Sequence, residues 1–254
     1  MMRYRKNKVP LTMAFLGGFI ILAMIINGGQ PAVRTSSAGA GDKRVIVLDA
    51  GHGGLDSGCV GVNGKEEKDI NLAVVKNLGE LLTFSGFEVV YTREEDVSIH
   101  DEGVEGIRNQ KLSDMENRLE IVQKYPDSIF ISIHQNQFTQ PEYFGGQMFY
   151  TTKNKNNFKF AQIMQDCFAE FQTGNDREIK LIDNDIYLLK NAKQPALLIE
   201  CGFLSNENDA KNLSDSEYQK KLAFTIFKGL TRYFEEVKDT EARNGENTNT
   251  LYMQ

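Results

Sequence analysis

The residues of this chain best suited to chemistry are histidines and acids that stand where predicted strands end. His52 lies in the segment Asp-Ala-Gly-His-Gly-Gly after one apolar run, and His134 directly follows another, 128–133. Either histidine alone could be structural. Because ligands bind at the carboxyl ends of the strands in parallel sheets, the two together predict one shared site. Neutral imidazole is a common zinc ligand, so a metal site is the favoured interpretation.

Carboxylates complete this prediction. Glu200 ends the apolar run 196–200, where an acid is costly unless it is paired or functional. Burial would raise its pKa, which suits a general base or acid. Two histidines and one carboxylate would leave a fourth zinc position open for water. Glu66, Glu67 and Asp69 are all candidates for that carboxylate, and spacing alone does not choose among them.

The elements that must position these residues alternate between strands and helices. The pattern predicts an α/β fold, a three-layer sandwich with a twisted, mostly parallel central sheet and helices on both faces. Strands are expected at 44–49, 87–91, 128–133, 144–151 and 196–200, with a short extended segment at 186–189. Helices are expected at 69–85, 115–124, 157–171, 207–213 and 217–236, and residues 94–114 form a polar insertion.

The two ends of the chain differ from its middle. Basic residues 3–8 precede the uncharged stretch 11–26, the order typical of a secretory signal. We therefore expect residues 1–27 to be a signal peptide or an N-terminal membrane anchor, and the protein to be exported in either case. Residues 28–43 read as a flexible linker, 44–236 as the catalytic domain and 237–254 as a polar C-terminal tail.

Composition excludes several other functions. The chain of 254 residues has 41% hydrophobic and 25% charged residues, as a globular protein does. Its net charge is −6, and the five basic side chains of residues 1–40 leave −11 on the remainder, which disfavours nucleic acid. Gly64-Lys65 is followed by Glu66 instead of Ser or Thr, so a phosphate loop is a poor match. Three scattered cysteines predict no disulfide framework, and His100 reads as a solvated loop residue.

Four ordered motifs resemble the zinc-dependent N-acetylmuramoyl-L-alanine amidases. They are Val47–Gly54, Asn63–Leu72, Phe130–Asn136 and Leu198–Asn206. The resemblance covers about Lys43 to Glu235, the whole predicted folded region. It implies Zn²⁺ as the cofactor and peptidoglycan, a muramyl peptide, as the substrate.

The resemblance also implies roles for single residues. The zinc ligands of the family fall on His52, Glu67 and His134, so the motif selects Glu67 from the three nearby acids. The catalytic glutamate of the family falls on Glu200, and Arg118 matches an arginine for which we expect a structural role.

The short single-domain form most resembles the spore germination-specific branch of the family. That branch implies action in the spore cortex, as the first step of muramic-δ-lactam formation, and a forespore or cortex location. The alternatives are a zinc peptidase that cuts within stem peptides and a non-catalytic wall-binding protein. Because no second wall-binding module is recognisable outside 43–236, we also expect access to the substrate to depend on localisation or on an accessory protein partner.

Overall fold

The computed structural model describes residues 44–182 and 186–251. The predicted signal or anchor, 1–27, and the predicted linker, 28–43, lie outside these residues. Within the described part of the chain, no helix combines the length and the apolar character needed to cross a bilayer.

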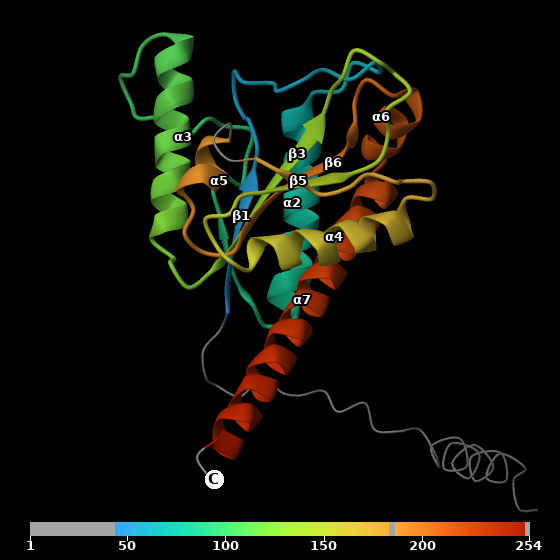
Figure 1. The fold of residues 1–254 in the computed structure, drawn as a ribbon. Coiled ribbons are helices and arrows are strands. Elements are labelled where there is room, and N and C mark those ends of the chain that lie inside the picture. Colours follow the sequence, from blue (N-terminus) through green and yellow to red (C-terminus); the bar gives the residue numbers. More distant parts are fainter. Residues whose placement is uncertain (1–43, 183–185, 252–254) are drawn as a thin grey trace, which may run out of the picture. The chain divides into compact units, whose positions relative to one another are not determined.

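A six-stranded sheet forms the centre of the domain (Figure 1). In chain order its strands are β1 (Val45–Ala50), β2 (Glu88–Tyr91), β3 (Ile129–Asn136), β4 (Gln147–Tyr150), β5 (Lys180–Leu181) and β6 (Ala196–Phe203). Their order across the sheet is β2-β1-β3-β6-β4-β5. All neighbouring pairs are parallel except β4 and β6, which run antiparallel. The expectation of a mostly parallel sheet is therefore confirmed.

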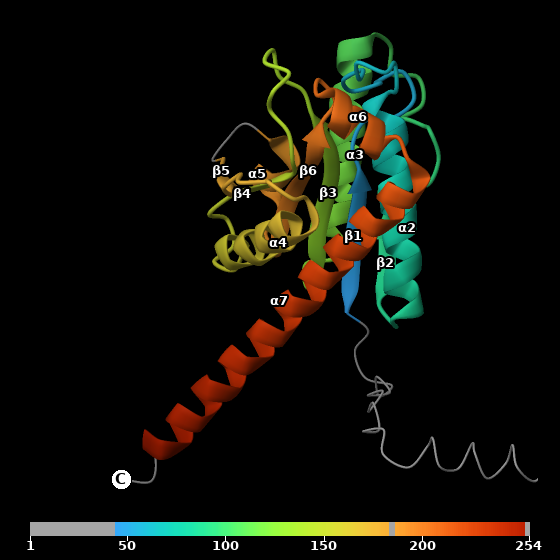
Figure 2. The same cartoon turned by 90° about the vertical axis from the view of Figure 1, so that its right-hand side faces the viewer.

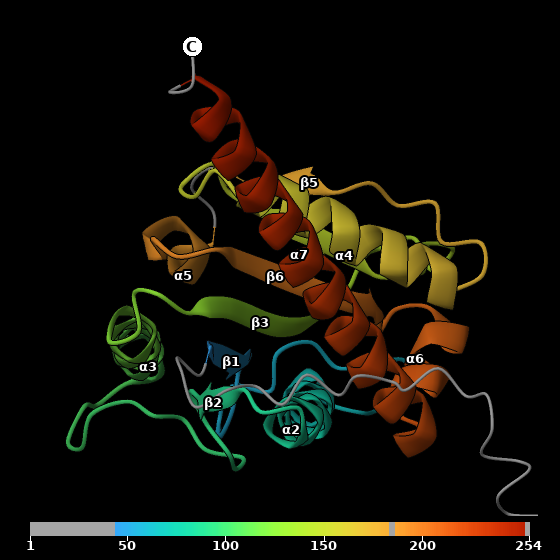
Figure 3. The ribbon, with the colours of Figure 1, turned by 90° about the horizontal axis from the view of Figure 1, so that it is seen from below.

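Helices cover both faces of this sheet (Figure 3). The helices are α2 (Glu67–Phe84), α3 (Ile107–Gln123), α4 (Asn157–Phe171), α5 (Tyr187–Asn191), α6 (Glu207–Leu213) and α7 (Ser216–Leu251). One buried cluster joins the sheet to α2, α4 and α7, and Figure 2 shows α2 and α7 side by side. A second, smaller cluster joins the opposite face to α3 and α5. These two cores make the predicted three-layer sandwich.

The alternation of side chains along β3 and β6 decides which helical layer His134 and Glu200 face. In β3, Ile131 and Ile133 belong to the larger core, whereas Phe130 belongs to the smaller one. Because successive side chains point to opposite faces, His134 shares the face of Phe130. By the same alternation, Glu200 shares the face of Leu198 in β6. His134 and Glu200 are direct partners in the β3–β6 register. Both therefore lie on the side of the sheet that α3 covers.

The predicted ends of these two strands were too early. β3 continues beyond His134 to Asn136, and β6 continues beyond Glu200 to Phe203. The two residues thus lie within paired strands instead of at their ends. Hydrophobicity ends before the backbone pairing does, because a site residue interrupts the apolar run while the strand hydrogen bonds continue.

Three helical predictions also differ from the structure. α3 begins at Ile107, inside the predicted insertion, because its buried side chains include the polar Ser113, Asp114 and Arg118 and hide the helical pattern. Residues 187–191 are helical instead of extended, since one helical turn is too short to show a period. Most of the predicted polar tail is helix, because α7 continues to Leu251 and propagation adds one hydrogen bond per residue.

Candidate metal centre

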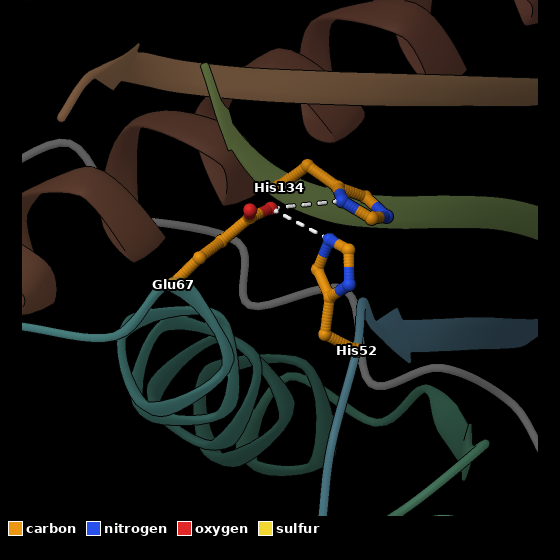
Figure 4. Close-up of side chains that lie close together, drawn as sticks. All are labelled: His52, Glu67 and His134. Atoms are coloured by element: carbon orange, nitrogen blue, oxygen red, sulfur yellow. Dashed lines mark hydrogen bonds and ion pairs between the residues drawn. The ribbon is translucent and has the colours of Figure 1, made fainter. Parts of the chain in front are cut away.

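Three side chains from distant parts of the chain converge at the carboxyl end of the sheet (Figure 4). His52 comes from the loop after β1, Glu67 from the start of α2, and His134 from β3. One ligand atom from each lies within 4.8 Å of the others. Glu67 Oε1 is 3.2 Å from His52 Nε2 and 3.0 Å from His134 Nδ1. The structure therefore brings together the three residues that the motifs selected.

The donor set fits a zinc ion. In a tetrahedral site with bonds of about 2.0–2.1 Å, two ligand atoms lie about 3.3 Å apart, close to the spacing seen here. Burial would lower the pKa of His52, but the hydrogen bonds and negative charges of Glu67 and Asp56 raise it to about 9. Burial would likewise raise the pKa of Glu67, but both histidines lower it. The carboxylate of Glu67 thus favours a positive charge on the imidazoles, and a metal cation could take the place of the protons that supply it.

Backbone amides hold the Glu67 carboxylate in place. Oε1 accepts a hydrogen bond from the Gln135 amide at 3.0 Å, and Oε2 accepts one from the Cys59 amide at 2.9 Å. Gly58, with φ of 66°, allows the close approach, since a Cβ there would lie 2.5 Å from Oε2. These contacts orient the carboxylate toward the two imidazoles.

Two buried arginines hold the turn that carries His52. His52 itself has φ of 63°, a strained conformation for a residue other than glycine. Arg118 donates to the carbonyls of Ala50 and His52, at 2.8 and 2.7 Å. Arg93 donates to the carbonyls of Ala50 and Gly51, at 2.9 and 3.1 Å. The tertiary structure thus maintains a turn that would be unfavourable by itself.

The turn also needs glycine beside the second histidine. A Cβ at Gly51 would overlap the imidazole ring of His134. The loop between β1 and α2 can therefore reach the metal centre only with glycine at this position.

Arg118 forms the centre of a buried ionic network. Its guanidinium lies 2.7 Å from Asp49 Oδ1 and 2.6 Å from Asp114 Oδ2. Asp49 also accepts hydrogen bonds from Ser132 and Thr92. Burial would raise the pKa of Asp49, but Arg118, His134 and these hydroxyls lower it to about 2. The network ties α3 to the strand ends beneath the metal centre, in keeping with the structural role expected for Arg118.

Replacing Arg118 with methionine is expected to lower the free energy of unfolding by about 3 kcal/mol, because buried carboxylates would lose their cation. Denaturant unfolding of the purified domain measures this loss. Arg108→Met on the exposed side of the same helix is the control, and it should change stability by less than about 0.5 kcal/mol. Equal stability of the two variants would contradict the role given to the network.

Asp56 contacts His52 at the ring nitrogen that faces away from Glu67, and the sequence analysis did not identify this residue. Asp56 Oδ2 lies 3.0 Å from His52 Nδ1, and Oδ1 lies 2.8 Å from Lys111 Nζ. An acceptor at Nδ1 fixes the tautomer that presents Nε2 to the metal and makes that nitrogen a better ligand. The available signal was an acid four residues after His52 in the same glycine-rich loop.

Replacing Asp56 with asparagine is expected to weaken zinc binding by about 10- to 100-fold, since the imidazole loses an anionic partner. Competition with a chromophoric chelator gives the affinity. Asp96→Asn is the matched control, because Asp96 lies nearby and bonds to Gly54 and Lys68 but to no histidine. If both variants bound zinc alike, Asp56 would have no such role.

Glu200 lies beside the three ligands but is not one of them. Its Oε2 is buried and has no hydrogen-bond partner in the described residues. Burial, assisted by the negative charge of Glu67, raises its pKa to about 7, although His134 and His52 oppose the shift. A carboxylate with an unused oxygen and a near-neutral pKa can accept and return a proton.

Other candidates named from the sequence lie outside the group. Glu66 pairs with Lys68 at 3.3 Å, and Asp69 lies in the first turn of α2. His100 is not the solvated residue that its polar surroundings suggested. It is partly buried, hydrogen-bonds to Ser98 and lines a cavity beside the metal centre.

Comparison with known proteins places this geometry among peptidoglycan amidases. A family model described as N-acetylmuramoyl-L-alanine amidase matches residues 46–232. The germination-specific N-acetylmuramoyl-L-alanine amidase of Bacillus subtilis (strain 168) is 37% identical over 231 residues, which are 89% of this chain and 96% of that protein. The N-acetylmuramoyl-L-alanine amidase AmiA of Escherichia coli (strain K12) is 26% identical, covering 76% of this chain and 78% of that protein.

Solved structures agree with these relatives. The CwlD amidase from Clostridioides difficile, in complex with the GerS lipoprotein, has a TM-score of 0.73 and 40% identity. The match covers 76% of this chain and 99% of that one. The catalytic domain of CwlV, an N-acetylmuramoyl-L-alanine amidase from Bacillus (Paenibacillus) polymyxa, has a TM-score of 0.64 and 29% identity, with 76% and 98% coverage.

Proposed function

The chain belongs to the Amidase_3 family of N-acetylmuramoyl-L-alanine amidases, and from that premise we propose that it is a zinc hydrolase whose ligands are His52, Glu67 and His134. The bond it cleaves joins the lactyl group of N-acetylmuramic acid to L-alanine of the peptidoglycan stem peptide. The observation that carries the zinc proposal is the convergence of two imidazoles and one carboxylate beside Glu200, whose Oε2 has no hydrogen-bond partner among the described residues.

The residues of the chain divide the chemical work. A zinc ion held by the three ligands would polarise the lactyl carbonyl and acidify the attacking water. Glu200 takes a proton from that water as the new carbon–oxygen bond forms. It then gives the proton to the nitrogen of L-alanine as the carbon–nitrogen bond breaks. The remaining proton of the new acid also passes to the amine, so the products are the muramic acid carboxylate and a stem-peptide ammonium group, and atoms and charge balance.

We place this activity in the spore cortex. Removal of stem peptides there is the first step toward muramic-δ-lactam, which germination requires. Support comes from the germination-specific relative in Bacillus subtilis and from the similarity to CwlD of Clostridioides difficile. Export is part of the same proposal, because the basic and then apolar order of residues 3–26 is typical of a secretory signal.

An accessory protein partner is also proposed. The folded part of the chain is one catalytic domain, and 99% of the CwlD chain that binds GerS is covered by the match. The partner would position or activate the enzyme at its polymeric substrate. Full activity of the purified protein alone on isolated cortex would contradict a required partner.

Metal analysis together with product mass spectrometry tests the proposed function. The purified protein should contain one zinc per chain and should release intact stem peptides that begin with a free L-alanine amine. A chelator should abolish this release, and added zinc should restore it. Fragments cut within the stem peptide would instead identify a peptidase, and binding to cortex without any product would identify a non-catalytic wall protein.

A further inference from the structure

A cavity of about 750 Å³ lies beside the metal centre, within the range typical of small-ligand pockets. His52, His134 and Glu200 line one end of it. The remaining walls come from the loop after β1, from α3 and the segment before it, and from α5 and β6. A substrate whose scissile bond lies at the metal centre must therefore place the group on one side of that bond in this cavity.

The lysine and arginine side chains on the cavity wall are paired with carboxylates. The lysine and arginine that line it, Lys111 and Arg118, each bind carboxylates, at 2.8 Å from Asp56 and 2.7 Å from Asp49. Asp96 is paired in the same way with Lys68, at 2.8 Å. Every lysine and arginine among the described lining residues therefore already has a carboxylate partner. Apolar side chains occupy much of the remaining wall, among them Ile107, Met115, Leu188 and Leu198.

One hydrogen-bonding group on the wall has an unused atom. Ser98 Oγ donates its only proton to Asp114 Oδ1 at 2.9 Å. It must therefore accept from His100 Nδ1, which lies 2.8 Å away. Asp114 is held by Arg118 at its other oxygen, so it acts as the acceptor in this chain. In the tautomer with its proton on Nδ1, His100 carries an acceptor at Nε2, for which the described residues provide no partner.

These features describe the ligand. It should be uncharged, it should present apolar groups to one wall, and it should offer an N–H or O–H donor to His100. The two sides of the scissile amide differ in these respects. The stem peptide carries free carboxylates, which this cavity could not pair. The muramic acid carboxyl group is consumed in the amide, so the sugar is uncharged, with methyl groups, hydroxyls and an N-acetyl N–H.

We infer that the cavity is the binding site for the N-acetylmuramic acid sugar, and that His100 Nε2 accepts a hydrogen bond from it. Ser98 and Asp114 are positioning residues, because they set the tautomer of His100. This inference rests on the proposed function and adds which side of the scissile bond the domain recognises. It also assigns a role in sugar binding to the segment before α3, since that segment supplies both Ser98 and His100.

A pair of substrates that differ only in the sugar tests the inference. One is an N-acetylmuramoyl tripeptide, and the other is the D-lactoyl tripeptide without the sugar ring. His100→Phe should raise KM for the first by roughly 3- to 10-fold, with kcat unchanged, because one neutral hydrogen bond is lost. The variant should leave kcat/KM for the sugar-free substrate unchanged. His100→Gln, which can place an amide oxygen near the position of Nε2, should restore part of the affinity.

Two controls separate binding from folding. Glu102→Gln changes an exposed residue of the same segment that does not line the cavity, and it should match the unsubstituted enzyme on both substrates. Zinc content and thermal unfolding of each variant show whether the domain is intact. An equal loss on both substrates, or no loss on either, would overturn the inference.

A binding measurement decides the matter without turnover. Calorimetric titration with N-acetylmuramic acid methylamide, an uncharged sugar without a stem peptide, should show binding that His100→Phe weakens. Equal binding by the two proteins, or none by either, would overturn the proposed sugar site. If the sugar bound but neither tripeptide was cleaved, the proposed hydrolytic function would fail while the sugar site stood.

Discussion

Replacing Glu200 with glutamine is expected to lower kcat by about 10²- to 10⁴-fold, the range typical of a general acid–base group. The glutamine fills nearly the same space but cannot accept a proton from water. Its neighbours His52, Glu67 and His134 are unchanged, so the zinc content should stay at one per chain. Stem-peptide release from cortex peptidoglycan, measured beside the metal content, gives the result. Unchanged turnover would remove Glu200 from the mechanism.

The pH dependence should report the same group. Only ionised Glu200 can take a proton from water, so kcat/KM should fall as the pH drops through the pKa of this group. Burial is the main cause that raises that pKa to about 7. A bound dication would favour the ionised carboxylate and move the acidic limb below pH 7. The residual activity of Glu200→Gln should lack this limb, and an unchanged profile would assign the limb to another group.

Replacing His134 with alanine is expected to weaken zinc binding by about 10²- to 10³-fold, since zinc affinities of about 10–16 kcal/mol shared among four ligands give about 3–4 kcal/mol each. Activity at limiting zinc should disappear with the metal. Chelator competition measures the affinity, and circular dichroism checks the fold. His134 is the better ligand to remove, because alanine at His52 would inherit that residue's strained positive φ.

The same variant also distinguishes a metal-ligand role of His134 from a purely structural role. His134 pairs in register with Glu200 across β3 and β6, so a purely structural role is conceivable. A structural role would lower stability in the presence and absence of zinc alike. A ligand role predicts that added zinc stabilises the original protein more than the variant, because stabilisation grows with the affinity of the folded state for the metal. Equal zinc-dependent stabilisation would contradict the assignment.

Parts of the site could be predicted from residue types alone. His52 and His134 follow apolar runs, and an acid ending an apolar run, as Glu200 does, is costly unless it is used. The alternation of apolar strands and amphipathic helices was enough to predict the layered α/β fold. These inferences succeed because hydrophobic burial and strand periodicity are local properties of the chain.

Other parts of the site had no local signal. The first half of helix α3 and the segment before it were predicted to be an insertion, because the buried face of this helix is built around the polar Asp114 and Arg118. Asp56 was missed and His100 was predicted to be a solvated loop residue, since Lys111, which binds Asp56, and Asp114, which binds Ser98 beside His100, come near them only when the chain is folded. Polar burial is decided by pairing, and pairing is a tertiary property.

The sequence by itself determined the types of residue at the site, the strands that carry two of them and, through the amidase motifs, the choice of Glu67. Only the tertiary structure decided how these residues meet. The start of α2 places Glu67 between the two imidazoles, while Glu66 binds Lys68 instead. Arg93 and Arg118 hold the strained turn of His52. The physical reason is that ligand geometry depends on contacts between residues far apart in the chain, which local patterns do not encode.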